Sequence, residues 1–113
     1  YAREALESAG VYSYLEENNI LMMAKDVRQA LLYADRGEVD GAFVYKTDAI
    51  LAKNATIALT VPESLYSSVV YPVALTPKGE KSELAKEFFK FLTSSEGGRI
   101  LSTFGFASPG DRQ

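Results

Sequence analysis

Apolar and polar residues follow one another along the chain in blocks that predict helices and strands in turn. Residues 2–9 have a helical pattern that Gly10 closes, because glycine readily takes the left-handed conformation found at helix C-termini. A short helical turn is expected at 12–17. The apolar run 20–23 is too short for a helix and lies between polar residues, so we predict a buried strand there.

The clearest predicted helix begins after Asp26. From Val27 to Ala34, apolar residues recur at the i, i+3, i+4 and i+7 spacing of a single helix face. Asp26 belongs to the residue types that cap helix N-termini, and Gly37 marks the expected end.

Two further predicted strands flank a short helix after this point. Residues 41–45 and 55–61 are apolar runs, and Thr47 between them can cap a helix through Ala52. Strands that alternate with helices are typical of βαβ units. We therefore predict an α/β fold with a mostly parallel sheet flanked by helices.

The next part of the chain is predicted to be extended and then helical. A turn is expected at 62–64. The extended run 69–76 contains Pro72, which has no N–H to donate and so suits a sheet edge or a crossing between domains. From Ser82 the pattern is helical again. Three aromatic residues of this helix are expected in the core: Phe88, Phe89 and Phe91.

A last helix start is expected at a capping box. Thr93 is followed three residues later by Glu96, and Gly105 marks the expected end of the helix. Residues 108–113 have the composition of a frayed tail.

Composition narrows the chemistry that the chain can perform. The 12 Lys and Arg residues against 15 Asp and Glu residues give a net charge of -3 without any basic run, so nucleic acid is not an expected partner. Without Cys or His, thiol and imidazole metal sites, thiol nucleophiles and Ser-His triads are excluded. No stretch has the length of a membrane span. The chain opens inside a helical pattern, so we expect a fragment of a longer protein.

The candidate chemistry is that of an anion site. In a parallel sheet, ligands collect at the carboxyl ends of strands, beside the N-termini of the following helices. The junction from Met23 to Val27 offers free backbone amides, and Tyr45 offers a hydroxyl. These neutral donors suit a small, fully deprotonated oxyanion, whereas hydrogen phosphate would leave a donor unpaired at a cost of about 1–3 kcal/mol. Asp26 is expected to cap the helix or to turn toward Lys25 or Arg28.

Simpler interpretations remain open for each of these residues. Tyr45 could be a packed aromatic residue, and most helix N-termini bind nothing. Asp40 and Asp48 could form a carboxylate pair, but we expect solvated turn residues because they lie at opposite ends of the 41–45 run. Lys46 is expected to be a solvated loop lysine.

Three long stretches together resemble a known family. They are "DVRQALLYADRGEVDGAFVYKTDAILAKNATI", "VPESLYSSVVYPVAL" and "AKEFFKFLTSSEGGRILSTFGF". In order and spacing they resemble the C-terminal half of the molybdate-binding proteins that serve ABC transporters. The resemblance implies a lobe of the type II periplasmic-binding-protein-like class, in an incomplete fragment of a two-lobed protein. It also implies that the backbone amide of Val27 and the hydroxyl of Tyr45 bind the oxyanion.

The resemblance has further implications for the missing parts and the partners. A third amide contact would lie just before Tyr1, and two Ser side chains would come from the absent lobe. Residues 1–70 would belong to the second ligand-binding lobe, and 71–113 would pack on the N-terminal lobe. Left uncovered, the apolar faces of 71–113 predict either pairing with another copy or a rearranged contact. The implied protein is extracytoplasmic, delivers molybdate or tungstate to a membrane permease, uses no cofactor or directly bound metal, and is not an enzyme.

Three alternatives stay open. The chain could be the effector-sensing domain of a transcription regulator, it could bind a sulfate-type oxyanion, or it could be an interaction module without a ligand.

Overall fold

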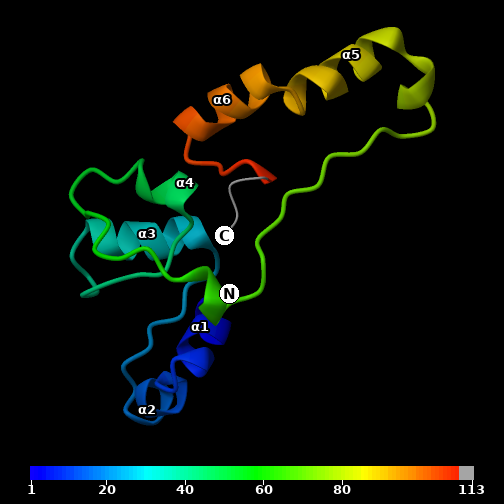
Figure 1. Cartoon of the computed structure of the whole chain (residues 1–113). Coiled ribbons are helices and arrows are strands. Elements are labelled where there is room, and N and C mark those ends of the chain that lie inside the picture. Colours follow the sequence, from blue (N-terminus) through cyan, green and yellow to red (C-terminus); the bar gives the residue numbers. More distant parts are fainter. Residues whose placement is uncertain (110–113) are drawn as a thin grey trace. The chain divides into compact units, whose positions relative to one another are not determined.

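The computed structural model describes residues 1–109, and its regular structure is helical (Figure 1). The elements, in chain order, are α1 (Ala2–Ser8), α2 (Tyr12–Glu17), α3 (Val27–Asp35), α4 (Lys46–Ala49), the 3-10 helices η1 (Glu63–Leu65) and η2 (Gly79–Lys81), α5 (Glu83–Leu92) and α6 (Ser95–Thr103). The chain divides into two compact units, Tyr1–Val69 and a second unit that begins at Val70. That residues 1–70 belong to the second ligand-binding lobe and that 71–113, predicted as a return strand and helices, pack on the absent N-terminal lobe stays a prediction.

The prediction of an α/β fold with a mostly parallel sheet was wrong for the described residues, which contain no strand. The runs 20–23, 41–45, 55–61 and 69–76 are irregular or extended instead. A strand has no internal hydrogen bonds and needs a neighbouring strand to pair with, and parallel sheets also need cover on both faces. Here the apolar side chains of these runs stay open to solvent, with Ile20 55%, Ile57 51% and Leu59 75% exposed.

The predicted helix ends at glycine were confirmed. Gly10 has a φ of 74°, its amide donates to the Glu7 carbonyl, and the next amide, of Val11, donates to the Leu6 carbonyl. This pair of bonds is the Schellman motif, which needs a left-handed residue after the helix. The same two bonds close α3 at Gly37 (φ 71°) and α6 at Gly105 (φ 93°).

The helix starts of the second unit were predicted to within one residue. The Ser82 hydroxyl accepts from the Ala85 amide at 3.3 Å and caps α5 as expected. Ser94, rather than Thr93, caps α6, because the Thr93 hydroxyl donates to the Phe89 carbonyl at 3.0 Å and so belongs to the end of α5. Of the predicted tail 108–113, residues 110–113 lie outside the described part.

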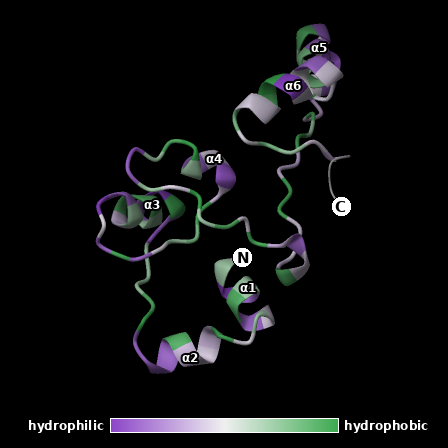
Figure 2. Cartoon of the chain, turned by 60° about the vertical axis from the view of Figure 1, so that its left-hand side comes forward, coloured by the Kyte–Doolittle hydropathy of each residue, from purple (hydrophilic) through white to green (hydrophobic). Residues whose placement is uncertain are grey.

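Little apolar surface is buried in either unit. Among the described residues, Ala5 is the one buried apolar side chain, with 4% of its surface exposed. Polar and apolar residues lie on different sides of α5 (Figure 2), yet Phe88 and Phe91 are 61% and 40% exposed. Their predicted place in the core was therefore wrong, and only Phe89 of the three is half-buried. Pairing with another copy stays a prediction.

No helix within residues 1–109 combines the length and the apolar character that crossing a membrane requires.

Candidate functional site

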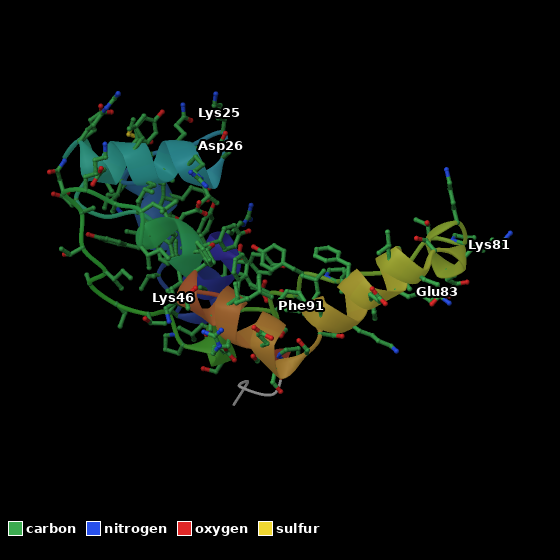
Figure 3. All side chains as sticks on the ribbon, turned by 90° about the horizontal axis from the view of Figure 1, so that it is seen from above. Lys25, Asp26, Lys46, Lys81, Glu83 and Phe91 are labelled. Atoms are coloured by element: carbon green, nitrogen blue, oxygen red, sulfur yellow. The ribbon has the colours of Figure 1, made fainter. Side chains whose placement is uncertain are left out.

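The N-terminus of α3 is held by two reciprocal side-chain bonds. The Asp26 carboxylate accepts from the Gln29 amide at 2.8 Å, and the Gln29 side-chain oxygen accepts from the Lys25 amide at 2.8 Å. This arrangement resembles a capping box and fixes the direction in which the chain enters the helix. Figure 3 shows Lys25 and Asp26 at this end of α3. The expectation that Asp26 caps the helix was confirmed.

Two backbone amides of the first turn of α3 are not used in hydrogen bonds within the described part of the chain. Within residues 1–109, the backbone N–H groups of Val27 and Arg28 have no acceptor. The aligned peptides of this nine-residue helix place partial positive charge at the same end. Together these features favour an anion at Val27, which is half-buried.

Tyr45 is the N-cap residue of α4 and does not end a strand. Its carbonyl accepts from the amides of Asp48 at 3.0 Å and Ala49 at 2.9 Å, so it occupies the N-cap position that we predicted for Thr47. The Tyr45 ring meets the edge of the Tyr1 ring at a centroid distance of 6.5 Å and an angle of 68°. The Tyr45 hydroxyl forms no hydrogen bond to another described residue. The ring is therefore packed while the hydroxyl remains available.

An ion pair joins the first turns of these two helices. Arg28 Nε lies 2.6 Å from Asp48 Oδ1, and α3 and α4 lie side by side (Figure 1). The Asp48 side chain is only 14% exposed, so its prediction as a solvated turn residue was wrong. Asp40 is exposed, and Lys46 is also exposed although it starts α4. The structure therefore brings the helix turns of Val27 and Tyr45 together.

Asp35 is a structural residue that the sequence reasoning missed. Its Oδ1 accepts from three successive amides, those of Asn54 at 2.7 Å, Ala55 at 2.8 Å and Lys53 at 3.1 Å. These bonds, that of Ala55 first, lower the pKa of Asp35 below its usual value. An acidic residue at a helix C-terminus opposes the helix dipole, and this mismatch was the available signal.

A depression lies elsewhere in the first unit. It has a volume of about 290 Å³ and is lined by Tyr12, Glu16, Asn19, Leu21 and Met23. It contains neither Val27 nor Tyr45, so it is separate from the candidate anion contacts. Among residues 1–109, no group of three or more acidic side chains is placed to hold a metal ion.

Comparisons with known proteins place the sequence of this chain in a family. The model of bacterial extracellular solute-binding proteins matches residues 1–107. The chain is 32% identical over 108 residues to the substrate-binding lipoprotein YvgL of Bacillus subtilis, whose name assigns it provisionally to an ABC transporter; the match covers 96% of this chain and 41% of YvgL.

Two molybdate-binding proteins also match. ModA of Escherichia coli is 34% identical over 106 residues, which cover 94% of this chain and 40% of ModA. ModA of Haemophilus influenzae is 32% identical over 108 residues, with 96% and 41% covered. The chain thus spans about two fifths of the length of these curated relatives. No solved structure matches it significantly. The chain belongs to the family of bacterial extracellular solute-binding proteins.

Proposed function

We propose that this chain is part of an extracytoplasmic protein that binds molybdate, or tungstate, for import by an ABC transporter. The observation that carries the proposal is the similarity to two molybdate-binding proteins over almost the whole chain. The available donors at the paired turns of α3 and α4 are consistent with it. The protein would act by binding and release, with no reaction of its own.

The proposed contacts are the Val27 amide and the Tyr45 hydroxyl. Both are neutral donors, so they favour an oxyanion that keeps no proton, such as the molybdate dianion. Hydrogen phosphate would set its own O–H against a donor and lose about 1–3 kcal/mol. Sulfate is also fully deprotonated, and its exclusion would depend on cavity size.

The proposed place of the chain in the whole protein follows from its length. Residues 1–70 would contribute to the second ligand-binding lobe, and 71–113 would pack on the N-terminal lobe, which supplies further contacts. The exposed apolar face of α5, with Leu84 78% and Phe88 61% exposed, is suited to such cover. The closed, loaded protein would dock on a membrane permease and release the anion when docking opens it.

The testing experiment is calorimetric titration of the native protein that carries this sequence with molybdate, tungstate, sulfate and phosphate. We expect tight binding of the first two and weak binding of the others. Tyr45→Phe removes one donor and should weaken molybdate binding by about 1–3 kcal/mol.

The matched control is Tyr66→Phe. Tyr66 packs edge-on against Tyr1 at 6.3 Å, in the same aromatic cluster, but it is not a proposed contact. The Tyr66→Phe variant should bind molybdate as tightly as the unaltered protein. Equal loss in both variants would show that the hydroxyl of Tyr45 has no special role. No response to any of the four anions would contradict the function and favour an interaction module without a ligand.

A further inference from the structure

Arg28 is a cation placed next to the proposed anion contact but committed to another partner. It directly follows Val27 in the first turn of α3. Its Nε lies 2.6 Å from Asp48 Oδ1, and the two side chains are 72% and 14% exposed, respectively. The carboxylate is therefore the enclosed partner, and most of the guanidinium faces solvent.

An uncommitted arginine at this position would change how an oxyanion is recognised. A guanidinium is always charged and presents a fork of donors that fits carboxylate, sulfate and phosphate oxygens alike. It would add binding energy for any of these anions. Neutral N–H and O–H donors, in contrast, discriminate by geometry and by the proton that the anion retains.

We propose that Asp48 is a specificity residue that withholds Arg28 from the anion. This inference rests on the proposed function. By pairing with Arg28, Asp48 cancels a positive charge beside the site, so that the ligand is held by neutral donors. The enclosure of Asp48 makes it a fixed partner, and its position in the first turn of α4 lets it reach Arg28 from the helix that Tyr45 begins.

The test is titration of the native protein and its Asp48→Asn variant with molybdate, sulfate and phosphate at low and at high ionic strength. We expect sulfate and phosphate to bind about five-fold more tightly to the variant at low ionic strength, the upper range for an exposed ion pair. The gain should disappear at high salt, because screening acts on an exposed guanidinium. Molybdate should gain less than the other two, and an equal gain for all three anions would overturn the proposal, because specificity is a difference between affinities.

The double variant Arg28→Gln with Asp48→Asn separates the freed arginine from the lost carboxylate. It should return sulfate and phosphate affinity to that of the unaltered protein. A gain that persists in the double variant would overturn the proposal, since repulsion by Asp48 would then be the cause. Equal weakening of all three anions in Asp48→Asn, without a change in salt dependence, would also overturn it, because the pair would then only position the helices.

A third variant, Arg28→Gln alone, tests the same charges if Asp48→Asn fails to fold. It leaves the Asp48 carboxylate uncompensated and should weaken all three dianions, most strongly at low salt. Unchanged binding in this variant would contradict the proposal. If the unaltered protein binds none of the anions, the proposed function fails first, and this inference fails with it.

Discussion

Two adjacent glycines in α6, Gly97 and Gly98, should respond differently to substitution by alanine: the first variant should lose stability and the second should not. A Cβ added at Gly97 would collide with the carbonyl oxygen of Phe91 and lie 2.9 Å from that of Leu92. These are backbone atoms and cannot swing aside as a side chain could. Among residues 1–109, a Cβ at Gly98 would meet the Ser108 hydroxyl oxygen alone, at 3.4 Å, which is van der Waals contact.

The expected magnitudes follow from this difference. Alanine is a better helix former than glycine by up to about 1 kcal/mol, and this gain applies to both positions. At Gly97 the collision would push the first turn of α6 away and strain the bond from the Gly97 amide to the Ser94 hydroxyl, now 3.2 Å long. Overpacking and a weakened cap outweigh the gain, so we expect a net loss of about 2 kcal/mol.

The assay is urea unfolding of the native protein and of both variants. Gly98→Ala should leave stability unchanged or raise it by up to about 1 kcal/mol, and it serves as the control for the helix propensity of alanine. A Gly97→Ala variant as stable as Gly98→Ala would refute the close approach of α6 to the end of α5.

Two further predictions concern the aspartates at the ends of α3. Asp26→Ala should lower the free energy of unfolding, measured by thermal or urea unfolding, by about 1 kcal/mol. Asp26→Asn keeps a capping oxygen and should cost much less, so equal losses in the two variants would contradict the capping role. Asp35 has a lowered pKa in the folded state, so its stabilising effect is complete above about pH 4, the usual Asp value, and is lost as the pH falls further. The stability advantage over Asp35→Asn should therefore shrink as the pH falls below about 4, and an advantage that grows on acidification would reverse the assigned sign.

The helices could be predicted from sequence because their signals are local. Gly10 and Gly37 end helices through bonds within the same few residues, and Asp26 caps α3 through the amide three positions on. Asn19 follows the same rule at the end of α2, where its φ is 55°, although asparagine is a weaker signal than glycine. That the run 41–45 forms no strand could not be predicted in this way, because a strand depends on partners far along the chain.

In the candidate site, too, local features could be predicted from the sequence and long-range contacts could not. The helix start at Val27 could be predicted because it is a local feature, and its amide as an anion contact stays a proposal. The setting of Tyr45 was not, since its ring packs on Tyr1, 44 positions away in sequence. The Arg28–Asp48 pair was missed for the same reason, because both residues are typical of solvated helix turns until the fold brings α3 and α4 together.

The pairing of three carboxylates around α3 bears on how the proposed anion site could consist of uncharged donors in an acidic chain. Asp26 is bound to the Gln29 amide, Asp35 to three amides at 53–55, and Asp48 to Arg28. Each negative charge is thus directed to a partner within the first unit, and two of the three use backbone amides alone. Of the first-turn amides of α3, the Gln29 amide donates to the Asp26 carboxylate, whereas those of Val27 and Arg28 have no acceptor within residues 1–109 and still carry partial positive charge. An oxyanion could then be held there without a cation in contact with it.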